Sequence, residues 1–414
     1  MLSALLTQAA ATSAEDSHRV KERSEIDPEY LWATERMFAD SEAWNNTFAE
    51  VEKQIPDIEA LKGTLGQSAQ SLLSALKKRD ALEPVLEKVY VYASMLADQD
   101  TREGGPQGMK QRIISMYSKY GQAASWFQPE LTAIPFETLD SWMRQVPELA
   151  VYRQYFDNLY RQKKYILSPR EEELLAMTAE VRQTAGNAYN LLANADISFP
   201  GIKDESGEEV ELDDSAFYKY MRSTDRRVRK DAYYAIVGTY KKNRNTAAAL
   251  LNGAVQGHIL TVKARGYDSC LQAALNPDNI PPVVYETLVG TINDNLALLH
   301  RYQQIRKKAL KLDDGVRAYD LFAPLVEDQT LEYSYQDAIK TINEALQPLG
   351  GEYLSAMNNG FNSRWVDVYP TKGKRSGAYS SGTYLTDPYM LMNFHGSYED
   401  TSTLAHEMGH SMHS

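Results

Sequence analysis

Apolar residues recur three or four positions apart along most of this 414-residue chain, and this helical periodicity constrains its fold more than any other feature. Pro84 is expected in the first turn of one helix. Ser168, Pro169 and Glu171 form a capping box at the start of another. The pattern predicts helices over roughly 83–98, 168–192, 214–245, 246–264, 282–312 and 335–360. A mainly α-helical fold follows.

Two segments interrupt the helical pattern. Residues 198–214 contain a proline, two glycines and an acidic run, which predict a strand and turn or a linker between lobes. Residues 367–400 contain four glycines and β-forming clusters such as YMLMNF at 389–394. We expect this second segment to form a small hairpin or sheet that leads directly into the last helix.

Composition excludes several classes of protein. The formal net charge of −12 argues against nucleic-acid binding, which needs basic patches. Cys270 is the single cysteine, so a secreted disulfide scaffold is excluded. A length of 414 residues is long for one domain, so two or more lobes are expected.

The sequence also bears on location. It has no apolar run near the roughly 18 residues that a transmembrane helix needs, so no membrane partner is expected. Residues 1–16 partly resemble a signal peptide but lack a basic start. The predicted location is the cytoplasm, and export is the alternative.

The segment STLAHEMGHSMHS at 402–414 contains the clearest chemical signal. Side-chain oxygens at 400–403 suit a helix N-cap, so a helix is expected to follow them. On that helix, His406 and His410 lie one turn apart and project from the same face. Glu407 follows the first histidine directly. This is the HExxH arrangement of zinc hydrolases, which combines two metal ligands and one general base.

Each of these residue types has a role in such a site. Neutral imidazoles bind Zn²⁺ at about 2.0–2.1 Å, and the ion lowers the pKa of its water ligand toward about 7. Glu407 is then expected to accept the proton of the attacking water and to pass it to the departing amine. A solvated helix end with surface histidine and glutamate side chains is the alternative.

A catalytic zinc site also needs a third protein ligand. His413 lies on the same helix face and is a candidate metal ligand, but it is about 10 Å beyond His406 along a straight helix. The roles of ligand and of packing residue therefore both stay open for His413. The sequence stops at Ser414, so we expect a zinc enzyme whose C-terminal part is missing.

Five segments together carry a family resemblance, from about Leu82 onward. The strongest is KRSGAYSSGTYLTDPYMLMNFHGSYEDTSTLAHEMGHSMHS at 374–414. The weaker ones are SWFQPELTAIP (125–135), KKYILSPREEELLA (163–176), STDRRVRKDAYYAI (223–236) and KARGYDSCLQAAL (263–275). They resemble the oligoendopeptidase F branch of the thimet-oligopeptidase family of zinc metallopeptidases.

The resemblance implies a mainly α, two-lobed helical metallopeptidase. Such a protein has a deep central channel and a small β-hairpin or sheet before the HExxH helix. The regions implied are an N-terminal helical region (1–120), an oligopeptidase F-type N-terminal domain (121–200) and an incomplete peptidase catalytic domain (215–414).

The resemblance also implies a site. One zinc ion per chain would be held by His406 and His410, with Glu407 as the catalytic base. The strand at 389–394 would present its edge to the substrate backbone. The glutamate ligand that the family carries on a later helix has no counterpart in this sequence.

The predicted function is hydrolysis of internal peptide bonds in short unstructured peptides, so oligopeptides are the expected partners. Two alternatives are a catalytically inactive truncated fragment and a non-catalytic peptide-binding helical protein. A fragment would expose apolar helix faces. The sequence sets neither the oligomeric state nor the cleavage preference.

Overall fold

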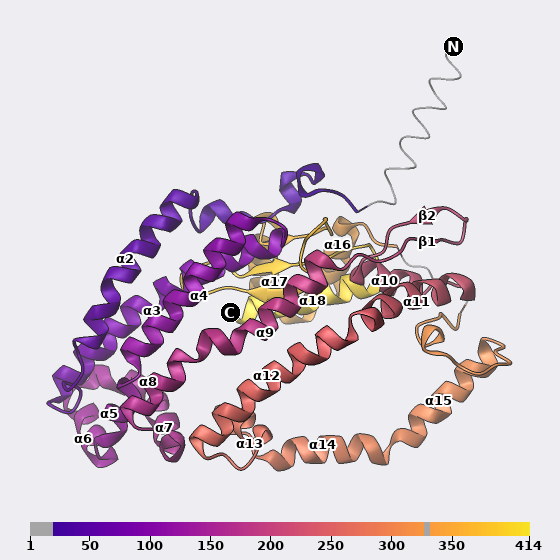
Figure 1. The fold of residues 1–414 in the computed structure, drawn as a ribbon. Helices are drawn as coiled ribbons and strands as arrows, with labels where there is room; N and C mark the ends of the chain where they lie inside the picture. The colour runs from indigo at the N-terminus through magenta and orange to yellow at the C-terminus, as the bar shows by residue number, and fades with distance from the viewer. Residues whose placement is uncertain (1–19, 327–331) are drawn as a thin grey trace.

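The computed structural model describes residues 20–326 and 332–414, and it shows a mainly helical chain with two small sheets (Figure 1). The predicted mainly α fold, with a small sheet before the last helix, is confirmed. The signal-like segment at 1–16 lies outside the described residues. Within the described part, no helix is both long and apolar enough to cross a membrane.

The helices and strands follow one another in two stretches. The first half contains α2 (Ser41–Glu59), α3 (Ala69–Gln99), α4 (Gly104–Ala124), α5 (Phe127–Ala133), α6 (Phe136–Gln145), α7 (Arg153–Gln162), α8 (Pro169–Met177), α9 (Ala179–Leu191), β1 (Ile202–Lys203) and β2 (Glu209–Val210). The second half contains α10 (Asp214–Met221), α11 (Arg226–Lys242), α12 (Arg244–Arg265), α13 (Cys270–Leu275), α14 (Pro282–Asp294), α15 (Leu296–Ala309), α16 (Tyr335–Ala345), α17 (Gly351–Asn362), β3 (Val366–Asp367), β4 (Tyr379–Ser381), β5 (Tyr389–Leu391) and α18 (Tyr398–His413).

Both segments that interrupt the helical pattern form sheets, as the sequence predicts. The first is the antiparallel β1–β2 hairpin. The second sheet has the order β3–β5–β4, in which β5 runs parallel to β3 and antiparallel to β4. Met390 in β5 is paired with Val366 on one side and with Ser380 on the other.

The start of α3 differs from the sequence-based expectation. Pro84 lies inside this long helix rather than in its first turn, and the helix is capped by Ser68, whose side chain accepts a hydrogen bond from the Ser71 backbone at 3.1 Å. Leu72 and Leu86, on either side of the proline, are both buried. Burial of this kind outweighs the one backbone hydrogen bond that the proline removes.

The capping box at Ser168 is confirmed, because Glu171 accepts a hydrogen bond from the Ser168 backbone at 3.0 Å. The helix predicted over 168–192 is nevertheless divided into α8 and α9 at Thr178. The Thr178 hydroxyl donates to the carbonyl of Leu175 at 2.7 Å. This local bond competes with the helical backbone pattern and accompanies the break.

Strand β5 is buried on both faces, which explains its nearly continuous apolar sequence. Tyr389 and Leu391 pack into the core formed with α2, α3 and α4. Met390 and Met392 point the opposite way and pack into the core formed with α16, α17 and α18. The sheet therefore joins the N-terminal helices to the last helix.

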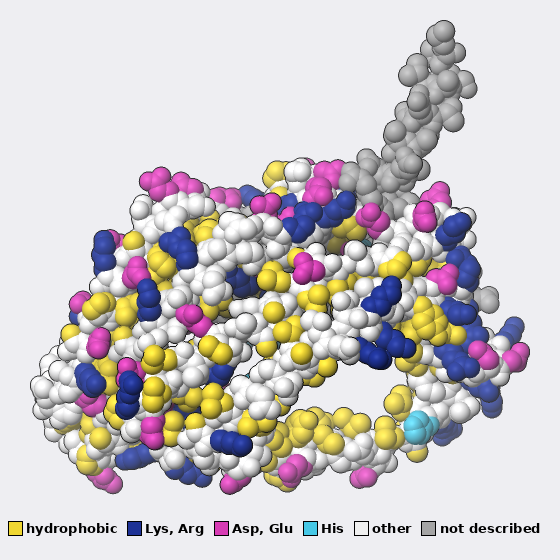
Figure 2. Space-filling model, in the orientation of Figure 1, with side chains coloured by type: hydrophobic (Ala, Val, Ile, Leu, Met, Phe, Trp, Pro, Cys, Tyr) yellow, Lys and Arg dark blue, Asp and Glu magenta, His cyan; other side chains and the backbone are white. Residues whose placement is uncertain are grey.

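Helices α14 and α15 border an opening on the face shown in Figure 2, and much of their apolar surface is exposed. The exposed apolar side chains on these two helices are Val283, Val284, Tyr285, Leu288, Val289, Ile292, Leu296, Leu298, Leu299, Tyr302 and Ile305.

Candidate metal centre and active site

The turn that leads into α18 is fixed by glycine and by a capping box. Gly396 has a φ of 89°, and a Cβ atom there would lie 2.8 Å from the carbonyl oxygen of Tyr333. Ser397 is the N-cap, and its hydroxyl accepts a hydrogen bond from the backbone of Asp400 at 3.1 Å. The Asp400 carboxylate in turn accepts from the Ser397 backbone at 2.9 Å. The helix therefore begins at Tyr398, earlier than the cap predicted at 400–403.

Helix α18 has a buried face and an exposed face, and the motif histidines lie on the exposed one. Leu404 and Met408 are fully buried against the three-stranded sheet and its neighbouring helices. His406, His410 and His413 are exposed. Two apolar residues four positions apart anchor the helix, so the rings one turn apart on the other face are held at a fixed separation.

The structure brings His406 and His410 together. Their Nε2 atoms are 3.1 Å apart, and their ring centroids are 4.8 Å apart at an interplanar angle of 80°. Two nitrogens bound to one tetrahedral zinc ion at about 2.0–2.1 Å are about 3.3 Å apart. The observed separation therefore fits two imidazoles that share one ion.

Glu407 is partly exposed and follows His406 on the helix, about 100° further round the axis. Among the described residues, its carboxylate makes no hydrogen bond or ion pair. An uncommitted carboxylate next to this histidine pair is available to accept a proton from a water molecule.

His413 lies in the last turn of α18. Across residues 20–326 and 332–414, no three histidine, cysteine or acidic side chains are grouped so as to hold a metal ion. The structure thus pairs His406 with His410 but does not bring His413 into that pair. A metal-binding role for His413 stays a prediction.

The expectation that the strand at 389–394 offers a free edge is wrong. Strand β5 is the central strand of its sheet, with β3 on one side and β4 on the other. The burial of its two faces between separate helical cores requires this central place. Among the described strands, the edge nearest α18 belongs to β4, where the Ser380 hydroxyl lies 2.9 Å from that of Ser411.

Strand β4 is anchored at its other end by Tyr379. The phenol donates a hydrogen bond to Asp98 at 3.2 Å. Burial, followed by the negative charge of Asp98, raises the pKa of Tyr379 well above its ordinary value, so the phenol stays protonated. The sequence gives no sign of this contact, because its partners are 281 residues apart.

A cavity of about 710 Å³ adjoins the first turns of α18, and it is lined mainly by residues from α10, from the loop before α18 and from α18 itself. His395 lies in its wall, and its Nε2 atom is 3.7 Å from a carboxylate oxygen of Asp213. The structure shows Asp400 as the partner of Ser397 in the capping box.

Comparisons with known proteins match this region and most of the chain. A model of "Peptidase family M3" matches residues 219–414, which include the three-stranded sheet and α18. A model of "Oligopeptidase F" matches residues 130–199. The curated protein Oligopeptidase PepF of Bacillus subtilis is 40% identical over 405 residues. The chain belongs to peptidase family M3.

Other peptidases and two solved structures are also similar to this chain. Group B oligopeptidase PepB of Streptococcus agalactiae is 39% identical over 95% of this chain. The crystal structure of oligoendopeptidase-F from Enterococcus faecium is 33% identical over 77% of this chain, with a TM-score of 0.67. A putative peptidase from Chlamydophila abortus is 36% identical, with a TM-score of 0.65 over 96% of this chain.

The chain covers only part of these M3-type proteins. It spans 60% of the Bacillus protein, 65% of the Streptococcus protein and 61% of the Enterococcus structure. Family M3 is a family of metallopeptidases. The residues of the HExxH motif in this chain lie within the part that the M3 model matches.

Proposed function

We propose that this chain carries the zinc-binding helix and the general base of an oligoendopeptidase that cleaves internal bonds of short unstructured peptides. The main support is the pair of Nε2 atoms 3.1 Å apart in His406 and His410, beside the uncommitted carboxylate of Glu407. The names of the M3 relatives, oligopeptidase and oligoendopeptidase, support peptides as the substrate class.

In the proposed mechanism, His406 and His410 would hold one zinc ion through Nε2. When bound, such an ion would lower the pKa of a water molecule and polarise the carbonyl group under attack. Glu407 would accept a proton from the attacking water molecule as its oxygen bonds to the carbonyl carbon. Glu407 then passes the proton to the amine nitrogen as the C–N bond breaks. The free edge of β4 is the place where an extended peptide backbone would be bound.

The test is hydrolysis of an internally quenched peptide, measured together with zinc content. Glu407→Gln is expected to lower turnover by about 100-fold or more while zinc stays bound, since the amide cannot accept the proton. His406→Ala is expected to lose both zinc and turnover. Undiminished hydrolysis by Glu407→Gln, or hydrolysis that resists a chelator, would show that this assignment is wrong.

His413→Ala separates the two roles that the sequence leaves open for this residue. A fall in zinc affinity like that of His410→Ala would identify His413 as a ligand. An unchanged affinity would make it a packing residue. The distance of about 10 Å along the axis from His406 makes this comparison informative, because a straight helix holds the two rings apart.

We also propose that the boundaries at 121–200 and 215–414 separate an oligopeptidase F-type N-terminal domain from a peptidase domain. The ranges of the two family matches, 130–199 and 219–414, support this division. Limited proteolysis that cuts first between residues 200 and 215 would agree with it, whereas first cuts inside either domain would not.

A further inference from the structure

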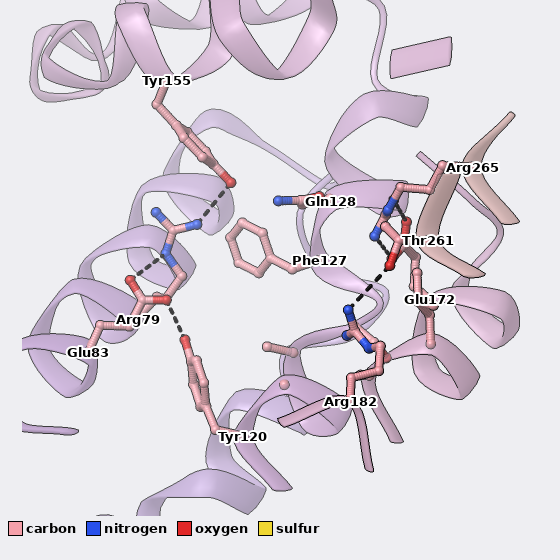
Figure 3. A pocket seen from close by; sticks show the side chains of 15 residues that line it. Arg79, Glu83, Tyr120, Phe127, Gln128, Tyr155, Glu172, Arg182, Thr261 and Arg265 are labelled. Atoms are coloured by element: carbon pink, nitrogen blue, oxygen red, sulfur yellow. Dashed lines mark hydrogen bonds and ion pairs between the residues drawn. The ribbon is translucent and has the colours of Figure 1, made fainter. Parts of the chain in front are cut away.

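A second cavity lies among the N-terminal helices, away from α18. Its volume is about 330 Å³, and its wall comes from α3, α4, α5, α7, α8, α9 and α12. Figure 3 shows Arg79 and Tyr155 on one side, Arg182 and Thr261 on the other, and the ring of Phe127 between them. The lining includes no residue of the three-stranded sheet or of the HExxH helix.

The lining carries more positive than negative charge. It contains three arginines and two glutamates, which leaves one formal positive charge. Arg265 is neutralised by Glu172, which accepts two hydrogen bonds from it at 2.7 Å each. Arg182 makes no ion pair with any described residue, and its hydrogen bonds go to two neutral hydroxyl groups.

The guanidinium group of Arg182 is held in place before any ligand binds. Its Nε donates to the hydroxyl of Thr178 at 3.1 Å, and its Nη1 donates to that of Thr261 at 3.2 Å. Its aliphatic stem passes over Gly257, where a Cβ atom would lie 3.4 Å from the Arg182 Cγ. Within the described part of the chain, Nη2 keeps both of its donors unused. A fixed guanidinium with free donors is suited to a carboxylate.

The opposite wall offers a second buried donor on an aromatic surface. The Nε of Arg79 is buried without a hydrogen-bond partner in the described residues, and its nearest carboxylate oxygen, on Glu83, is 3.5 Å away. Glu83 is engaged by the hydroxyl of Tyr120 at 2.6 Å. The guanidinium carbon of Arg79 lies 5.0 Å from the ring centroid of Phe127 and 4.8 Å from that of Tyr155. Asp80 also approaches Arg79 at 3.5 Å but does not line the cavity.

We propose that this cavity binds a small organic monocarboxylate with an aromatic or apolar body. The carboxylate would pair with Arg182, and the body would lie against Phe127, Ala124 and Leu175. One unbalanced positive charge matches a single negative charge better than the double charge of a phosphate. A free amino acid and the C-terminal residue of a short peptide share this chemistry.

Calorimetric titration of the 414-residue chain tests the proposal without any need for turnover or zinc. 3-Phenylpropionate and N-acetylphenylalanine are expected to bind saturably at millimolar concentration or below, and the neutral 3-phenylpropanol is not. Tighter binding of N-acetylphenylalanine than of phenylalanine would identify a peptide C-terminus as the ligand, and the reverse would identify a free amino acid. Acetate or inorganic phosphate binding as tightly as 3-phenylpropionate would overturn the proposal.

Arg182→Met keeps the length of the stem and removes the charge, so carboxylate binding is expected to weaken by about tenfold or more. Arg182→Lys keeps the charge without the planar fork and is expected to bind with intermediate affinity. Arg170→Met is the matched control, because Arg170 is an exposed arginine on the neighbouring α8 and does not line the cavity. Equal affinity in the wild-type chain and in both Arg182 variants would show the proposal to be wrong.

Discussion

At the scale of single residues, Asp367 in β3 is a fully buried charge in the three-stranded sheet. Its carboxylate and the Lys374 side chain are both fully buried, and they are 2.7 Å apart. Arg23 binds the same carboxylate at 2.5 and 3.2 Å. We expect Asp367→Asn to destabilise the chain by about 3 kcal/mol or more, because it leaves the Lys374 charge buried without its partner.

Urea unfolding measures this change. Asp387→Asn is the control, because Asp387 pairs with Arg36 in a partly exposed ion pair, where the loss is expected to be small. Equal losses in the two variants would contradict the structural role assigned to Asp367.

The same carboxylate predicts a pH dependence. Burial by itself raises the pKa of Asp367, but the charges of Lys374 and Arg23 outweigh burial and hold the pKa below its ordinary value. A lowered pKa in the folded state stabilises the fold above the unfolded pKa, and this contribution is lost as the pH falls through the folded pKa. The urea concentration at the midpoint of unfolding of the wild-type chain should therefore decrease when the pH is lowered below about 4. The midpoint of Asp367→Asn should fall less over the same range, and parallel curves would exclude this account.

The residues of the HExxH motif and the residues around Asp367 differ in how far the sequence could predict their contacts. His406, Glu407 and His410 lie within little more than one helical turn, so their spacing alone predicts that the two imidazoles share a face and that the carboxylate lies beside them. Arg23 and Asp367 are 344 residues apart, and no local pattern connects them. The sequence left the role of His413 open because this residue lies on the same helix face as the pair but about 10 Å beyond His406 along the axis.

At the scale of elements, the start of α18 shows what local signals do and do not decide. The chain offers capping side chains at 400–403, but Ser397 caps the helix because the left-handed turn at Gly396 precedes it. The spacing of Ser397 and Asp400 is itself a capping-box signal, and it competes with the capping side chains at 400–403. Most other helix positions follow from periodicity, and the misplaced boundaries have several causes, such as burial in α3 and the Thr178 side-chain bond between α8 and α9.

We expect Ser397→Ala to destabilise the chain by about 1 kcal/mol, since it removes the acceptor for the Asp400 backbone and a partner of the Asp400 carboxylate. Ser397→Thr should keep most of the stability, because its hydroxyl can both accept from the Asp400 backbone and donate to the Asp400 carboxylate. Ser402→Ala, at an exposed position of the same helix, is the control and should change stability by less than about 0.5 kcal/mol. Thermal unfolding compares the three variants, and a loss of equal size in Ser402→Ala would reject the capping role.

At the scale of the whole molecule, the N-terminal segment packs against the sheet that supports the C-terminal helix. The indole of Trp32 donates to the carbonyl of Met390 at 2.7 Å, and the Tyr389 hydroxyl donates to that of Ala33 at 3.0 Å. These contacts show that the sheet beneath α18 is packed against residues from the beginning of the described chain. Periodicity predicts the helices but not this arrangement, because it depends on pairs more than 350 residues apart.

The exposed apolar faces of α14 and α15 give the last prediction. Leu288 and Ile292 are four residues apart on α14 and are 58% and 56% exposed. Hydrophobic side chains gather along this helix in Figure 2. Surfaces of this kind bind apolar dyes and promote association. The chain is therefore expected to enhance the fluorescence of anilinonaphthalene sulfonate. The double variant Leu288→Gln and Ile292→Gln should show a weaker signal with stability changed by less than about 1 kcal/mol.

Val151→Gln is the matched control for that double variant. Val151 is 79% exposed but lies in the short 3-10 helix Pro147–Tyr152, outside α14 and α15. A single exposed apolar side chain gives the dye no extended surface, so this variant should leave the fluorescence unchanged. The comparison separates exposure of one residue from the apolar face of α14. If the signal were the same in all three proteins, the dye would bind elsewhere and the face on α14 would be covered in solution, for example by association of two chains through it.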